Sequence, residues 1–207
     1  MPNVSNVKTK FFGAVDALDA DGISVAATIG SATTLTLGGT LTSGGSYTSG
    51  DNIGQLVTIL SAGDDSGITF TVVGTDAVGD DLTEVVTGAS GAPGTATSSG
   101  YFNTVTSITT SAATAGDVSA GVTGTGTGTV FAGRTRIRGL QGLSGATAGN
   151  LLFKNTSVTG TTLLTVPTQA AAELIEPYIP DNAVLFDAGA YVNFGSAVAT
   201  VTVFYDG

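Results

Sequence analysis

The sequence predicts an all-β protein with almost no helix, organised as two antiparallel domains of the β-sandwich or jelly-roll kind. Of the 207 residues, 35 are Thr and 31 are Gly. Thr, Val and Ile favour strands because their branched side chains suit a pleated backbone. Lys, Glu, Arg and Gln, which usually cover helix surfaces, are scarce. Short apolar runs are separated by Gly, Asp, Asn or Ser, which is typical of many short strands joined by tight turns.

Eight strands are expected in the first part of the chain. Apolar residues alternate with Thr most clearly in 56–60 and 69–72, so one face of each strand would be buried and the other would be wet. The loop 76–81 predicts a hairpin in which Gly79 takes a positive φ. The expected strands are 22–30, 33–38, 55–61, 68–75, 82–87, 95–102, 107–111 and 118–122.

Seven further strands are expected in the second part. Residues 201–205 alternate between apolar and polar positions, apart from the closing aromatic pair. Pro177 and Pro180 place 174–180 at a sheet edge or in a rigid loop, because proline cannot donate to a ladder. A helical turn is weakly indicated at 169–176. The expected strands are 129–140, 150–155, 161–167, 174–178, 183–186, 191–194 and 199–205.

The Gly–Thr repeat at 123–129 is interpreted as a linker, because alternating Gly and Thr offer little apolar surface for a core. This predicts a first β-sandwich domain at 21–122 and a second at 130–207. Residues 1–20 are expected to form an N-terminal arm. Two alternatives remain open for it: an arm that becomes ordered on a neighbouring subunit, or a frayed terminus.

The composition excludes several function classes. There is no His and no Cys, so a Ser-His-Asp triad, a Cys nucleophile, a zinc finger and an iron–sulfur cluster are all ruled out. The formal net charge is −10, and we therefore expect no nucleic-acid partner. No apolar stretch is long enough for a membrane span, and the N-terminus lacks the apolar region of a secretory signal, so we expect no membrane association.

Two groups of carboxylates are candidate chemical sites. The loop with Asp64 and Asp65 and the loop 76–81 could supply oxygen ligands to Ca²⁺, or could be solvated hairpin turns. The turns are the favoured interpretation, because neither loop has the spacing of an EF-hand. Glu84, Glu173 and Glu176 could form a glycosidase pair, but nothing places two of them across a cleft. We therefore expect no catalytic residue, no metal, no cofactor and no enzymatic activity.

The basic residues are the candidates for contact with a partner. Arg134, Arg136 and Arg138 alternate along an expected strand, so they would share one face. That stripe is either a contact to an acidic surface of another domain or subunit, or a solvated strand face. The second candidate is the arm, with the contact residues Lys8, Lys10, Phe11 and Phe12.

The segment 57–72, continuing through 74–76 and 82–88 and followed by 101–108, resembles a β-module of tailed-bacteriophage virion proteins. The second part is also similar to a phage structural module. Its marks are 145–150, 163–168 and 201–205. Together the two resemblances cover about residues 20–207.

This resemblance implies a structural component of a virion without catalytic activity. The expected role is a capsid decoration, or cement, protein that binds the outside of the head and stabilises contacts between subunits of the major capsid protein. It would be made in the host cytoplasm and be a homo-oligomer, for which a trimer would suit threefold positions of a shell. The alternatives are a neck, tail or tail-fibre protein, including one that binds the host surface.

Overall fold

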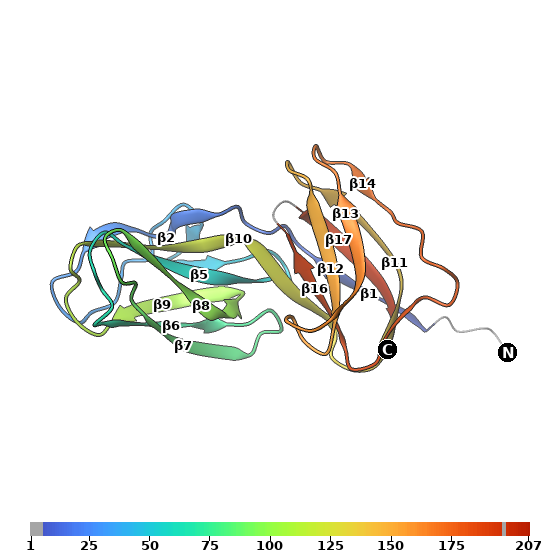
Figure 1. Cartoon of the computed structure of the whole chain (residues 1–207), viewed down its shortest axis with the longest axis horizontal. Helices are drawn as coiled ribbons and strands as arrows, with labels where there is room; N and C mark the ends of the chain where they lie inside the picture. Colours follow the sequence, from blue (N-terminus) through green and yellow to red (C-terminus); the bar gives the residue numbers. More distant parts are fainter. Residues whose placement is uncertain (1–5, 196–197) are drawn as a thin grey trace. The chain divides into compact units, whose positions relative to one another are not determined.

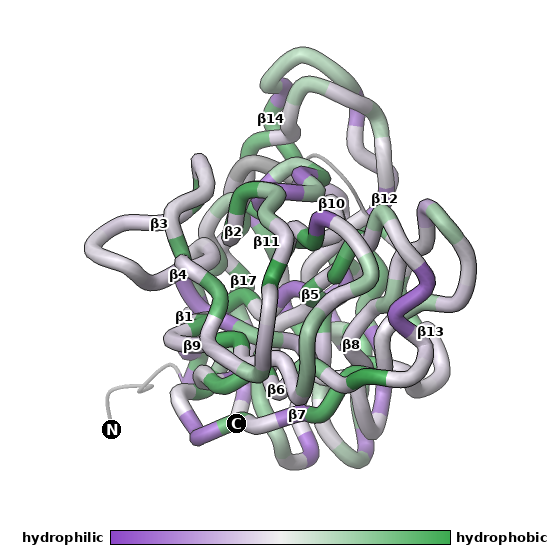
Figure 2. Tube along the Cα trace, turned by 90° about the vertical axis from the view of Figure 1, so that its left-hand side faces the viewer, coloured by the Kyte–Doolittle hydropathy of each residue, from purple (hydrophilic) through white to green (hydrophobic). Residues whose placement is uncertain are grey.

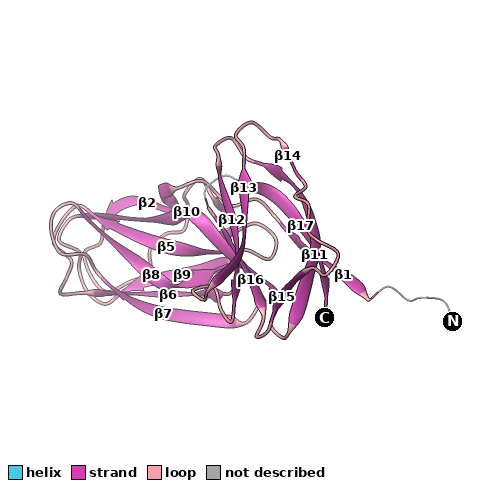
Figure 3. Ribbon diagram, turned by 45° about the vertical axis from the view of Figure 1, so that its right-hand side comes forward, coloured by secondary structure: helices cyan, strands magenta, loops and turns pink. Residues whose placement is uncertain are grey.

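The computed structural model describes residues 6–195 and 198–207, and these residues form strands and loops but no helix (Figure 3). The prediction of an all-β protein is therefore confirmed. The chain divides into two compact units. Unit 1 comprises Met1–Val15, Asp51–Ile53 and Thr125–Gly207, and unit 2 comprises Asp16–Gly50 and Gly54–Gly124.

Seventeen strands are formed by the described residues, and most of them coincide with the strands expected from the sequence (Figure 1). Figure 2 shows apolar and polar stretches alternating along the trace. The strands are β1 (Val7–Phe12), β2 (Asp19–Thr28), β3 (Thr42–Ser43), β4 (Ser46–Thr48), β5 (Gly54–Ser61), β6 (Thr69–Thr75), β7 (Asp81–Thr87), β8 (Gly94–Phe102), β9 (Thr104–Thr110), β10 (Asp117–Phe131), β11 (Thr135–Ser144), β12 (Gly149–Asn155), β13 (Thr162–Thr168), β14 (Leu174–Ile175), β15 (Val184–Phe186), β16 (Ala190–Phe194) and β17 (Val198–Asp206).

Unit 2 buries its apolar side chains between two groups of strands. One group is sheet C, with the strand order β3-β4-β9-β6-β7; the other is formed by β2, the first part of β10, β5 and β8. Alternation along β5 and β6 turns every second side chain inward. The largest buried side chains of this core are Tyr47, Phe70 and Phe102.

The expected hairpin in unit 2 is present. β6 and β7 pair antiparallel from Thr69↔Thr87 to Thr75↔Asp81. The amide of Asp76 donates to the carbonyl of Asp80 at 2.9 Å. Gly79 has a φ of 92°, the left-handed conformation that the sequence predicted for it.

Unit 1 has its own core, to which two sheets contribute. Sheet A has the strand order β1-β17-β11-β14, with β15 also paired to β11. The other group is formed by β13, β12, β16 and the last part of β10. Aromatic rings are prominent in this core; the rings of Phe12 and Phe194 lie 5.6 Å apart between centroids.

The Gly–Thr stretch at 123–129 is part of a strand and not a linker. It lies inside β10, and the division between the units falls within it, after Gly124. Thr127 is buried, and a Cβ at Gly128 would come within 2.3 Å of the Phe12 ring. Glycine is therefore required at this position because an aromatic ring packs directly on the backbone, a contact that no local sequence pattern reveals.

The expected N-terminal arm also differs from the structure. Residues 1–5 lie outside the described residues, but Val7–Phe12 form β1, which pairs antiparallel with β17. Phe12 is fully buried in the core of unit 1. The Phe12 side chain therefore belongs to the core, whereas the sequence had suggested an exposed contact residue.

Two local expectations are wrong. The helical turn at 169–176 is absent, and both Ala171 and Ala172 have positive φ, which no right-handed helix contains. The expected strand 33–38 is reduced to one isolated bridge between Thr34 and Thr109. In both segments the local composition was compatible with regular structure, but the backbone follows contacts with distant residues, such as the bond from the Leu35 amide to the Ile108 carbonyl.

Candidate interaction surface

The side of sheet A that faces away from the core of unit 1 carries the candidate site. We call it the outer face of sheet A. The register places its side chains in rows across the strands, because residues directly opposite each other point to the same side. These rows are Val7–Asp206–Arg136, Thr9–Phe204–Gly139, Phe11–Thr202–Gln141 and Thr200–Leu143–Leu174.

Several large apolar side chains of this face are accessible to solvent. Val7 and Phe11 are each 43% exposed, Leu143 is 46% exposed and Leu174 is 60% exposed. Phe204 is half-buried and lies over the backbone of Gly139. This sheet face has apolar side chains between Thr and Gln. Covering it with a partner removes apolar surface from water and is therefore favourable.

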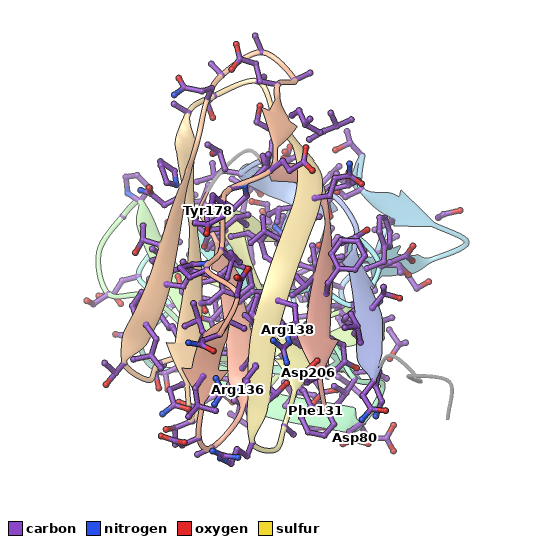
Figure 4. The ribbon with its side chains drawn as sticks, turned by 90° about the vertical axis from the view of Figure 1, so that its right-hand side faces the viewer. Asp80, Phe131, Arg136, Arg138, Tyr178 and Asp206 are labelled. Atoms are coloured by element: carbon purple, nitrogen blue, oxygen red, sulfur yellow. The ribbon has the colours of Figure 1, made fainter. Side chains whose placement is uncertain are left out.

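An arginine and a carboxylate are joined on the same face (Figure 4). The Nη2 atom of Arg138 lies 2.5 Å from Oδ2 of Asp206, and its Nε donates to the same oxygen at 2.7 Å. The hydrogen bond to Asp206 raises the pKa of the Arg138 guanidinium above its ordinary value. Because of a bulge between Ile137 and Gly139, two successive residues, Arg138 and Gly139, lie on the outer side before Leu140 returns to the core.

Two arginines also hold the loop 176–183 between β14 and β15. Arg136 donates to the carbonyl of Asn182 at 2.6 Å, and Arg138 donates to the carbonyl of Asp181 at 3.0 Å. Tyr178 in this loop is 87% exposed. The loop therefore presents an aromatic ring while its far end is fixed to β11.

Arg134 lies just before β11 and forms an exposed ion pair with Asp187, with 3.6 Å between Nε and Oδ1. A shallow cavity of about 270 Å³ lies beside it, lined by Arg134, Thr135, Arg136, Leu185, Asp206 and Gly207. The ion-pair partners that the structure gives to the arginines thus belong to unit 1. Contact of these arginines with a second molecule remains a prediction.

The four arm residues do not form one surface. Lys8, Lys10 and Phe12 are opposite Tyr205, Val203 and Val201, which point to the core side, whereas Phe11 points to the outer face. The Nζ atom of Lys8 lies 5.8 Å from the centroid of the Phe131 ring, a cation–π contact. Strand alternation separates neighbours that the sequence analysis had grouped together.

Sequence reasoning missed Val7, Leu143 and Leu174 as surface residues. Leu140 and Leu143 lie three residues apart in β11, yet the former is buried and the latter is exposed. Alternation places these two residues on opposite sides of the sheet. Which of them faces outward is determined by the bulge earlier in β11. The bulge depends on pairing with β17, and Gly139 inside the strand is the one feature of the β11 sequence that could have indicated it.

The other chemical candidates are dispersed. The Glu84 carboxylate in unit 2 accepts hydrogen bonds from the Ser99 amide at 2.7 Å and the Gly100 amide at 2.8 Å, while Glu173 and Glu176 belong to unit 1. Within 6–195 and 198–207, no group of three or more carboxylates could hold a metal ion. No helix among these residues could span a membrane.

Comparison of the chain with protein-family models, with curated proteins and with solved structures finds no match.

Proposed function

We propose that the chain is a structural protein of a tailed-phage virion, specifically a capsid decoration protein that binds the outside of the head through the outer face of sheet A. The observation that carries this proposal is the row-by-row placement of Phe11, Leu143 and Leu174 on one exposed sheet face. A partner that covers these side chains removes apolar surface from water, and the free energy gained stabilises the assembled state.

The distribution of charge supports the assignment of unit 1 as the docking unit. Unit 1 contains all six basic residues and six acidic residues, whereas unit 2 contains ten acidic residues and no Lys or Arg. Many copies on a shell would bring like charges together if unit 2 were at the contact. Unit 2 therefore remains in solvent, and the neutral unit 1 meets the major capsid protein and neighbouring copies of the chain.

One observation favours a second function. Tyr178 is 87% exposed on a loop fixed by two arginines, and an accessible aromatic side chain on an anchored loop suits recognition of a host surface. A neck, tail or fibre component is therefore the second candidate.

The copy number of the chain in purified particles separates the two functions. We expect quantitative mass spectrometry to give one copy per one or a few major capsid subunits. About a dozen copies per particle would instead indicate the neck or tail. Absence from particles would contradict both.

The docking face is tested with heads that lack the protein. We expect the double variant F11S/L143S to lose at least tenfold in affinity for such heads. Val85 is 59% exposed in unit 2 and provides the matched control, V85S, which should bind like the natural chain. Equal affinities of all three proteins would exclude the outer face of sheet A as the docking site.

A further inference from the structure

A cavity of about 250 Å³ lies between the end of β13 and β14, within unit 1. Its lining comes from two segments, 166–169 and 173–177. Binding sites for whole small molecules usually have volumes of about 300–1,000 Å³. This cavity is smaller, and its lining combines apolar and acidic side chains, so it suits one amphipathic side chain of a partner.

The wall of the cavity is largely apolar. Pro167 belongs to β13, Leu174 and Ile175 form β14, and Pro177 follows that strand. Ile175 is part of the core of unit 1, whereas Leu174 is exposed. An aliphatic group that enters the cavity therefore leaves water for an apolar wall, which is favourable.

Backbone contacts with residues 144–145 hold one side of the cavity in place. The Ser144 amide donates to the Glu173 carbonyl at 2.8 Å, and the Glu173 amide donates to the Ser144 hydroxyl, also at 2.8 Å. The amides of Ala171 and Ala172 donate to the Gly145 carbonyl at 3.0 and 3.3 Å. This side of the cavity is thus fixed before a ligand arrives, so binding requires little ordering of the chain.

Two carboxylates line the cavity, those of Glu173 and Glu176, and no Lys or Arg lines it. Both glutamates are exposed, and within 6–195 and 198–207 neither forms an ion pair. Two like charges at one cavity favour a cationic ligand. The ammonium group of lysine has three rotatable donors that two separate carboxylates can share, whereas the planar guanidinium of arginine matches a single carboxylate. The long apolar stem of lysine also suits the wall.

We propose that this cavity binds a lysine side chain of the partner that covers the outer face of sheet A. Leu174 belongs both to the cavity lining and to that face, in the row Thr200–Leu143–Leu174, so the cavity adjoins the docking face. The inference rests on the proposed function, in which the partner is the major capsid protein. The stem of the lysine packs along the apolar wall, and its ammonium group binds Glu173 and Glu176. The sheet face supplies apolar contact area, and the cavity determines the orientation of unit 1 on the partner.

The first test measures affinity for heads that lack the protein. We expect the double variant E173Q/E176Q to lose about tenfold in affinity at low salt and much less in 1 M NaCl, because salt screens the attraction between the carboxylates and the approaching amine. D80N/D81N is the matched control, since it removes two exposed carboxylates of unit 2; it should bind like the natural chain. Because Glu173 and Glu176 are exposed, E173Q/E176Q should keep the Tm of the natural chain.

Zero-length cross-linking identifies the group that enters the cavity. A carbodiimide joins a carboxylate to an amine in direct contact with it, and an amide bond forms with loss of water. On heads that carry the natural chain, we expect tandem mass spectrometry to find Glu173 or Glu176 joined to a lysine of the major capsid protein. This cross-link should be absent from heads that carry E173Q/E176Q. A cross-link to a second copy of the chain alone would overturn the assignment to the capsid protein.

The variant F11S/L143S separates this inference from the proposed function. If F11S/L143S loses affinity while E173Q/E176Q binds like the natural chain, the docking face is supported and the lysine site is rejected. If F11S/L143S keeps its affinity and either glutamate is still joined to the capsid protein, the lysine site is supported and the sheet face is rejected. Natural affinity of both variants, without a cross-link, would reject both proposals.

Discussion

The two units stabilise their carboxylates by different means. In unit 1, Asp206 is paired with Arg138 and Asp187 with Arg134. In unit 2, which lacks basic residues, Glu84 is held by backbone amides and Asp117 by the hydroxyl of Thr28. The comparison teaches that hydroxyl groups of Ser and Thr and amides of turns stabilise carboxylates in unit 2 by hydrogen bonds, whereas guanidinium groups stabilise them in unit 1.

The interiors differ in the same sense. The core of unit 1 is rich in aromatic rings, whereas unit 2 contains a buried amide, Gln55, in a polar network. The Gln55 Oε1 accepts from the Asp16 amide, the Tyr47 hydroxyl and the Ser49 hydroxyl, each at 3.0 Å. Its Nε2 donates to the carbonyls of Asp16 at 3.1 Å and Thr123 at 2.6 Å. One side chain thus fastens three segments of unit 2.

The largest effect is expected from F12A. The change removes a fully buried ring that packs on Phe194 and on the backbone of Gly128, and it should lower the free energy of unfolding of unit 1 by about 3–5 kcal/mol. Urea unfolding gives the magnitude, and hydrogen exchange read by mass spectrometry assigns it to unit 1. The neighbouring exposed ring provides the control F11A, which should cost far less. Equal losses would mean that Phe12 is not a core residue.

Q55A tests the polar interior of unit 2. It leaves buried donors and acceptors without partners and should lower the free energy of unfolding by about 3 kcal/mol. Increased hydrogen exchange should begin in the segments around Asp16, Ser49 and Thr123. Gln141, which is exposed on β11, provides the matched control Q141A. A Q55A loss no larger than that of Q141A would show that the network contributes little.

A smaller effect, dependent on pH, is expected for D16N. Burial raises the pKa of Asp16 above its ordinary value of 3.8, while the hydrogen bond from Tyr47 lowers it. The folded chain therefore holds this proton more tightly than the unfolded chain. The resulting stability is fully present below pH 3.8 and is lost as the pH rises through the folded-state pKa.

Unfolding free energies of D16N and the natural chain should therefore agree near pH 3, and D16N should be the more stable at pH 7, where its neutral amide avoids burying a charge. D21N, at an exposed carboxylate, is the control for the change in net charge. A natural chain more stable than D16N at pH 7 would contradict the direction of the pKa shift.

The smallest effect is expected for R138A. Its partner Asp206 is within hydrogen-bonding distance, but the guanidinium is accessible to water, so we expect only a slight decrease in Tm at low salt and none in 1 M NaCl. R134A, whose ion pair with Asp187 is longer and more exposed, should not change the Tm. A large, salt-independent decrease in R138A would show that the loop 176–183 depends on this arginine for its fold.

The parts of the fold that sequence reasoning predicted are those set by local patterns. β5 and β6 were found because their alternation is clean, and the β6–β7 hairpin because Gly79 and its neighbouring aspartates specify a turn. β1 was missed because residues 1–20 were expected to form an arm, whereas the strand conformation of β1 depends on pairing with β17. In the same way, the burial of Asp65 depends on turns distant in the sequence, so the sequence alone provided no reason to expect Asp65 to be buried and Asp64 to be exposed.

The pairing of β1 with β17 also determines the order in which the chain can fold during synthesis. Val7 is opposite Asp206, so β1 cannot meet its partner until the strands β2 to β16 and then β17 have been made. Unit 2 is complete once residue 124 has emerged, because it comprises Asp16–Gly50 and Gly54–Gly124. Unit 2 can therefore fold before β17 has been made, whereas unit 1 cannot close until β17 is available to pair with β1.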